Sequence, residues 1–257
     1  MNNKSSTYKK IIHYFNQASR ERVKVMAADP LLNYEQKARQ KTIIKLLKPK
    51  RGETILDLGC GEGQDVKIIL PYGVNYIGLD ISLGMIEKAK EQFGSKNKIK
   101  FLVGNANKLP FKDETFEKIL CSEVIEHIPD YKKALNEIGR VLKKEGTLVL
   151  STPNQNSLYG LQRVLLDFIY KAHYHKGRRE NHPWDKWKRI KELKQALKEN
   201  SFSIKEIITV CYLPGELSYR LPLGIKRFLL LLIKPVERFM QTFIRRGGYI
   251  ICIKAKK

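Results

Sequence analysis

The sequence Ile55-Leu56-Asp57-Leu58-Gly59-Cys60-Gly61-Glu62-Gly63 decides the fold of this chain. Its apolar first half is typical of a buried strand. The three alternating glycines indicate a backbone that turns sharply and lies close to a ligand, since only glycine lacks a Cβ. The residues that follow favour a helix, whose N-terminal amides would point at that ligand. We therefore predict a strand, a ligand-binding loop and a helix.

The glycine spacing and the next acidic residue indicate which ligand this is. A dinucleotide site requires Gly-x-Gly-x-x-Gly, whereas here position 64 is Gln64 and the third glycine comes one residue early. Asp80 ends the next apolar run, where a carboxylate can accept both hydroxyls of a ribose. The pattern therefore argues against a nicotinamide cofactor and favours an adenosine-containing one.

Short apolar runs alternate with helical patterns outward from this loop. Such alternation predicts an α/β fold with a doubly wound, mostly parallel seven-stranded sheet. We expect strands over Thr54–Leu58, Asn75–Leu79, Ile99–Val103, Phe116–Cys121, Thr147–Ser151, Ser203–Val210 and Tyr249–Lys254. We expect helices over Tyr8–Ala18, Tyr34–Leu47, Gly63–Leu70, Leu83–Phe93, Val124–Ile128, Tyr131–Leu142, Leu158–Tyr170 and Ile190–Glu199.

The 257 residues suffice for one large α/β domain with appendages. We expect residues 1–50 to form an N-terminal helical cap and residues 51–257 to form the α/β domain. Within that domain, residues 155–190 are expected to form a lid region, and residues 213–247 an apolar and basic helical insertion before the last strand.

Charge and cysteine usage limit the function classes. The net charge is +23, but residues 51–159 carry 15 basic and 15 acidic side chains, so the excess lies in the flanks. We therefore attribute the excess positive charge to contacts with partners and not to the cofactor site. Four widely spaced cysteines and no apolar leader at the start predict a reduced, cytoplasmic protein.

Residues 50–155 resemble the class I S-adenosylmethionine (SAM)-dependent methyltransferases, in particular the methyltransferase type 11 branch that contains quinone-biosynthesis O-methyltransferases. The matching motifs, in order, are Ile55–Gly63, Gly78-Leu79-Asp80-Ile81-Ser82, Leu109-Pro110-Phe111, Ser122–Ile128 and Lys144-Glu145-Gly146-Thr147-Leu148. The resemblance implies that the cofactor is S-adenosyl-L-methionine.

The resemblance also implies roles for single residues. Gly59 and Gly61 would pack against the methionine part of the cofactor, and Asp80 would bind the ribose. Where the family usually has Asp after Gly104, this chain has Asn105, which still accepts hydrogen bonds but drops a charge. The full set of implied cofactor-binding residues is Asp57, Gly59, Cys60, Gly61, Asp80, Ile81, Asn105, Ala106 and Ser122.

The residues Glu123-x-x-Glu126-His127 are the candidate catalytic group. Methyl transfer is an in-line displacement that needs alignment, plus a base if the acceptor is a hydroxyl. His127, with Glu126 beside it, suits that proton transfer, although His127 could instead cap or pack against a short helix. Glu123, Glu126 and His127 could also bind a divalent metal ion. Some methyltransferases that resemble this chain bind metal through such a cluster, but many relatives with a similar Glu-His pair are metal-free, so metal is not favoured.

The segment from Leu221 to Arg246 mixes apolar residues at helical spacing with basic ones. Its longest apolar run is Phe228–Ile233, far shorter than the roughly 20 residues of a spanning helix. It could lie on an anionic membrane surface, or simply cover the substrate cavity.

These features leave several acceptors open. We favour methylation of an oxygen on a small lipophilic or membrane-associated acceptor, a quinone precursor or another lipid, because the insertion is rich in leucine. The protein would then be cytoplasmic and peripheral on the inner face of the membrane. The alternatives are an RNA substrate bound by the basic flanks, a soluble metabolite or glycan, and a non-enzymatic SAM-binding scaffold. Methylation of base amino groups is disfavoured, since Cys121-Ser122-Glu123-Val124 replaces the motif it requires. The sequence leaves the oligomeric state open.

Overall fold

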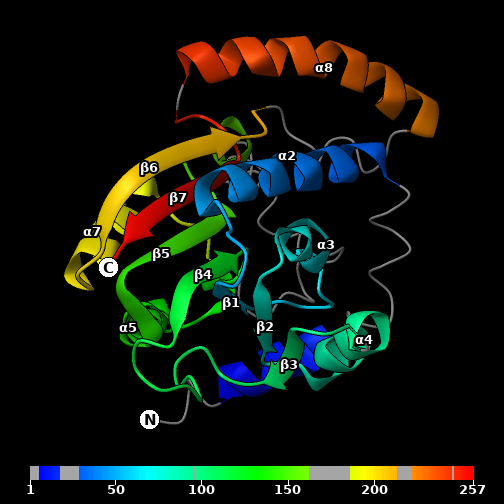
Figure 1. Cartoon of the computed structure of the whole chain (residues 1–257). Helices are drawn as coiled ribbons and strands as arrows, with labels where there is room; N and C mark the ends of the chain where they lie inside the picture. Colours follow the sequence, from blue (N-terminus) through cyan, green and yellow to red (C-terminus); the bar gives the residue numbers. More distant parts are fainter. Residues whose placement is uncertain (1–5, 18–28, 95, 162–185, 213–221, 245) are drawn as a thin grey trace.

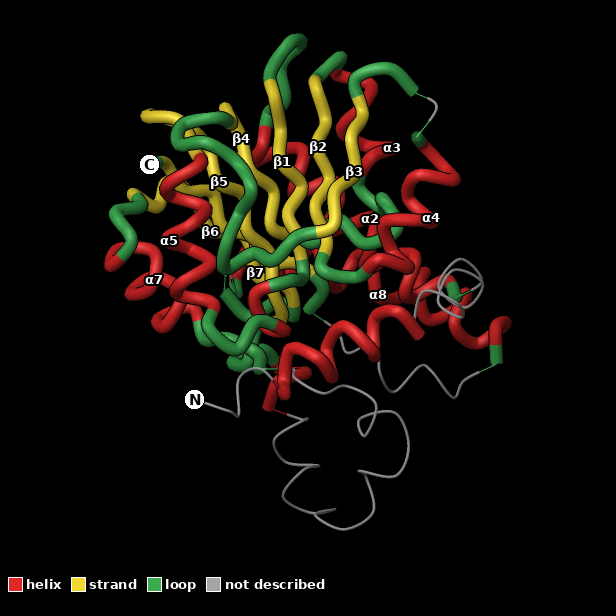
Figure 2. The backbone as a smooth tube through the Cα atoms, turned by 90° about the horizontal axis from the view of Figure 1, so that it is seen from below, coloured by secondary structure: helices red, strands yellow, loops and turns green. Residues whose placement is uncertain are grey.

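A computed structural model describes residues 6–17, 29–94, 96–161, 186–212, 222–244 and 246–257. Within them the chain forms a seven-stranded sheet between two layers of helices (Figures 1 and 2). The strands are β1 (Thr54–Leu58), β2 (Asn75–Asp80), β3 (Ile99–Val103), β4 (Phe116–Ser122), β5 (Leu142–Pro153), β6 (Ser203–Val210) and β7 (Ile250–Lys256).

The strand order is β3-β2-β1-β4-β5-β7-β6. Neighbouring strands run parallel from β3 to β5, and β7 is antiparallel to both β5 and β6. This confirms the predicted doubly wound, mostly parallel sheet. The order reverses between β1 and β4, and open α/β sheets bind their ligands at such a reversal, beyond the carboxyl ends of the strands.

Each face of the sheet carries its own apolar core. One core joins α2 (Pro30–Leu47), α3 (Val66–Ile69) and α4 (Leu83–Phe93) to the sheet. The other joins α5 (Tyr131–Val141) and α7 (Ile190–Glu199) to the opposite face. The last helix, α8 (Leu223–Phe243), confirms the helical spacing of the insertion and lies beyond α2, away from the sheet (Figure 1).

Three helix boundaries differ from the sequence prediction for local reasons. α2 begins at Pro30 because the Asp29 side chain accepts hydrogen bonds from the first free amides of the helix. The helix expected from Gly63 begins only at Val66, because Gly63 has a left-handed φ of +82°. Residues Ile125–His127 form a single 3₁₀ turn, shorter than the predicted helix.

The predicted appendages are described only in part. The first predicted helix is confirmed over residues 6–17. Residues 162–185 of the predicted lid and residues 213–221 of the insertion lie outside the described part of the chain. α2 buries Ile43, Leu46 and Leu47 in the same core as the sheet, so the domain boundary at residue 50 stays a prediction. Among the described residues, no helix is long and apolar enough to cross a membrane.

Candidate active site

The glycine-rich loop follows β1 and provides an open cradle. Gly59 and Gly61 have left-handed φ angles of +72° and +53°. A Cβ on Gly59 would lie 2.3 Å from a Val124 methyl group, whereas a Cβ on Gly61 would meet nothing within 4 Å. Gly59 is therefore required by its packing against the segment after β4, and Gly61 faces open space that a ligand can fill.

Asp80 connects this loop to the segment after β2. One carboxylate oxygen accepts a hydrogen bond from the Gly61 amide (2.9 Å), and the other accepts one from the Ser82 amide (2.8 Å). A carboxylate offers about four acceptor positions, so both oxygens can still accept hydroxyl groups of a ligand. Burial raises the pKa of Asp80, while the backbone hydrogen bonds act against that rise.

Two further carboxyl groups of the site resist ionisation. Asp57 accepts a hydrogen bond from the Tyr76 hydroxyl, and burial together with the charge of Asp65 raises the pKa of Asp57 to about 8. Burial and the neighbouring Glu126 raise the pKa of Glu123 to about 7. A positive charge nearby would favour the ionised form of both groups, so the site suits a cationic ligand.

Arg39 of α2 is a residue of this site that the sequence analysis missed. Its guanidinium lies 4.0 Å from an Asp65 oxygen, and its Nε is buried with no hydrogen-bond partner among the described atoms. The positive charge of Arg39 acts to lower the pKa values of Asp57 and Glu123, against the effect of their burial. Nothing in the sequence distinguishes Arg39 from the other basic residues of the flank.

His127 and Glu126 form a pair after β4. Glu126 is buried, and its carboxylate accepts a hydrogen bond from the Thr152 hydroxyl (2.9 Å). The His127 Nε2 lies 3.8 Å from the other Glu126 oxygen, and the ring packs edge-on against Phe15, 5.4 Å between centroids. At 3.8 Å the two groups make an ion-pair contact that is longer than a hydrogen bond, so the buried carboxylate lies beside the imidazole without a direct hydrogen bond to it.

Glu123 has a strained backbone with a φ of +56°, which costs a non-glycine residue about 1–2 kcal/mol. Such strain is concentrated at functional sites. The Glu123 carboxylate accepts a hydrogen bond from the Ser151 hydroxyl (3.0 Å). In the part of the chain that the structure describes, Glu123, Glu126 and His127 are not arranged as a metal-binding group, and no other such group occurs.

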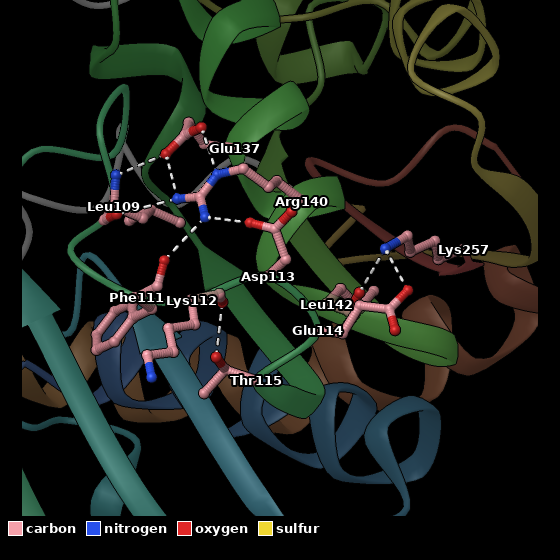
Figure 3. A network of polar contacts seen from close by, with 10 residues as sticks. All are labelled: Leu109, Phe111, Lys112, Asp113, Glu114, Thr115, Glu137, Arg140, Leu142 and Lys257. Carbon is pink, nitrogen blue, oxygen red and sulfur yellow. Dashed lines mark hydrogen bonds and ion pairs between the residues drawn. The ribbon is translucent and has the colours of Figure 1, made fainter.

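The loop after β3 is held from α5 by a polar network (Figure 3). Arg140 donates hydrogen bonds to the carbonyl oxygens of Leu109 (3.0 Å) and Phe111 (2.8 Å), and Glu137 accepts one from the Leu109 amide (2.8 Å). The network fixes the Leu109-Pro110-Phe111 motif. Glu137 and Arg140 are three residues apart in one predicted helix, and this spacing could have indicated the ion pair between them.

The helix over residues 6–17 contacts the segments after β2, β3 and β4. Asn16 accepts hydrogen bonds from the Ser82 hydroxyl (2.6 Å) and the Gly84 amide (3.2 Å). Tyr8 accepts one from the Asn107 side chain (2.6 Å). With Phe15 against His127, this helix bridges three of the four segments that carry the predicted site.

The remaining predicted cofactor-binding residues lie at the same edge of the sheet. Cys60 is buried in the glycine-rich loop, and Ile81 and Ala106 are half-buried after β2 and β3. Asn105 follows Gly104, whose amide donates to the Asp80 carbonyl, and its side chain accepts from the Asn107 amide (2.9 Å). Ser122 hydrogen-bonds Ser151. Their contacts with a cofactor stay predictions.

Residues 56–150 match the family model described as a methyltransferase domain. An uncharacterized protein of Methanocaldococcus jannaschii is 39% identical over 116 residues, which are 45% of this chain and 48% of that protein. A demethylmenaquinone methyltransferase of Staphylococcus aureus is 34% identical over 133 residues, which are 50% of this chain and 55% of the enzyme. The chain thus spans about half the length of the curated relatives it matches.

Solved structures share the fold of this chain over nearly its whole length. A SAM-dependent methyltransferase structure from Thermotoga maritima superposes with a TM-score of 0.64, covering 96% of this chain and 99% of that one. The two sequences are 19% identical. At this identity the likeness shows a shared fold.

Proposed function

We propose, from the premise that residues 56–150 form a class I SAM-dependent methyltransferase domain, that this chain methylates an oxygen of a small lipophilic acceptor. The observation that carries the proposal is the His127–Glu126 pair next to the glycine-rich loop. A base held in place by a buried carboxylate is needed when the acceptor is a hydroxyl or phenol. The similarity to a demethylmenaquinone methyltransferase supports a quinone-like acceptor.

The residues of the site fit the cofactor by shape and charge. S-adenosylmethionine supplies an electrophilic methyl group on a positively charged sulfur. Gly61 leaves open space beside the loop, Asp80 retains acceptor capacity for a ribose, and the raised pKa values of Asp57 and Glu123 favour a cation.

The side chains then divide the chemistry between alignment and proton transfer. With S-adenosylmethionine bound, His127 would accept the proton of the acceptor hydroxyl, while the methyl group passes from sulfur to that oxygen and the cofactor leaves as the neutral thioether. Glu126 stabilises the imidazolium that forms, and Thr152 holds Glu126 in place.

The class of acceptor is tested by incubating the full chain with methyl-labelled SAM and three fractions of an extract of its own host: membrane lipid, total RNA and soluble metabolites. We expect the label in the organic phase of the lipid fraction. A base-stable methyl group on a ring carbon of that lipid would show that the acceptor atom is carbon and not oxygen. Label in RNA, or only in water-soluble products, would contradict the proposed lipophilic acceptor.

The role of His127 is tested by His127→Gln, which keeps a polar side chain of similar size but removes the base. Loss of a general base lowers kcat by roughly 10²–10⁴-fold. We expect this loss with unchanged SAM affinity, which a titration with SAM measures beside the steady-state kinetics. The matched control is His13→Gln, on the exposed side of the helix over residues 6–17, which should keep full activity. A variant at His127 with wild-type kcat would show that the ring only packs against Phe15.

A further inference from the structure

α8 buries two charged side chains and exposes an apolar face, which is unusual for a surface helix. Its two buried described side chains are Lys226 and Glu237, with exposed fractions of 5% and 2%. They are three helical turns apart, so they lie on one face, which is the face toward α2. A helix docked on a protein normally buries its apolar stripe there.

Both buried charges are anchored by specific partners. The Lys226 ammonium contacts an Asp29 oxygen at 2.5 Å, and Asp29 also caps α2. Glu237 accepts hydrogen bonds from the Tyr34 hydroxyl (2.5 Å) and from the Tyr212 amide (2.9 Å). Turning α8 over would remove Lys226 from the buried Asp29 carboxylate and Glu237 from the buried Tyr212 amide. Leaving those partner groups unpaired under an apolar face is costly, so the anchors fix which face points outward.

The outward face of α8 is apolar. Phe228 is 61% exposed and Phe239 is 64% exposed, and the Phe239 and Phe243 rings stack at 4.5 Å between centroids. This apolar face consists of Ile225, Phe228, Leu231, Leu232, Val236, Phe239 and Phe243, all exposed. Exposed apolar patches of this kind mark interaction sites.

The charges around the apolar face select its partner. Arg227 is exposed beside it, and the helix sequence also contains Lys234 and Arg238. The single acidic residue of the helix, Glu237, is buried against α2, so no carboxylate is exposed among the described side chains of α8. The chain as a whole carries a net charge of +23. An apolar face with basic neighbours and no exposed acid is complementary to an anionic lipid surface.

We infer that the apolar face of α8 binds the surface of an anionic bilayer, with the helix lying in the interface. Its 21 residues span about 30 Å, and the charged anchors hold it along α2, parallel to the protein surface. The phenylalanine and leucine side chains then enter the boundary between headgroups and acyl chains. Membrane binding through α8 does not depend on which acceptor is methylated, so the two proposals can fail separately.

The test is flotation of the full chain with vesicles of pure phosphatidylcholine and with vesicles containing about one third phosphatidylglycerol, at two salt concentrations. We expect flotation with the anionic vesicles, weakened by salt. The double variant Phe228→Ser/Phe239→Ser should lose roughly tenfold or more of its partitioning, because it removes two apolar anchors. The matched control is Tyr72→Ser/Leu102→Ser, two exposed apolar residues outside α8, which should float like the wild type.

Three results would overturn the inference. The first is equal flotation of the Phe228→Ser/Phe239→Ser variant and the wild type, and the second is no flotation of the wild type. The third is a wild-type dimer by light scattering that becomes a monomer in the double variant, since a second copy would then cover the face. A Phe239→Trp variant gives an independent readout: its emission should shift to shorter wavelength with anionic vesicles only.

Discussion

Gly59→Ala is expected to abolish measurable SAM binding and to lower the stability of the protein. The new Cβ would lie 2.3 Å and 2.8 Å from the two Val124 methyl groups, far inside van der Waals contact. The left-handed φ of +72° adds about 1–2 kcal/mol, and overpacking adds about 1–3 kcal/mol. The loop must therefore move away from Val124, which displaces Gly61 from Asp80.

Isothermal titration with SAM and thermal unfolding together check this prediction. The matched control is Gly52→Ala, where φ is +86° but an added Cβ meets nothing within 4 Å. It carries the backbone strain without the clash, and it should bind SAM like the wild type. Adding Val124→Ala to Gly59→Ala should recover part of the stability. Wild-type affinity in the Gly59→Ala protein would show that the loop does not contact the cofactor.

Asp80→Asn is expected to weaken SAM binding by roughly 100-fold, because hydrogen bonds to a charged group contribute about 1.5–3 kcal/mol each. An amide has a single oxygen, so it can accept from Gly61 or from Ser82 and must turn an NH₂ group toward the other donor. The same change removes the acceptor for one ribose hydroxyl. S-adenosylhomocysteine should lose affinity to the same extent, since it has the same ribose.

The control for this substitution is Glu91→Gln, which neutralises an exposed carboxylate near the end of α4. It makes the same chemical change away from the glycine-rich loop and should leave the affinity for both ligands unchanged. Equal affinities of Asp80→Asn and the wild type, measured by titration on folded protein, would remove Asp80 from the proposed cofactor site.

Local sequence patterns predicted most of the sheet. The strands over Thr54–Leu58, Ile99–Val103 and Ser203–Val210 have the predicted bounds, because short apolar runs between turn residues leave little choice of register. The contact of Asp80 with the glycine-rich loop could also be predicted from the sequence, since parallel strands bring their carboxyl ends to one edge of the sheet. β5, by contrast, extends from Leu142 to Pro153, beyond its apolar centre, because pairing with β4 and β7 continues there.

What the sequence by itself determined about this protein is therefore the sheet, the glycine-rich loop and the acid that joins it, all features of short-range periodicity and backbone conformation. Only the tertiary structure placed Arg39 and Phe15 at the site, since both come from helices distant in sequence from the loops they contact. Only the tertiary structure also turned the apolar face of α8 outward. A helical pattern shows that two faces differ, but the partners of Lys226 and Glu237 decide which face is buried.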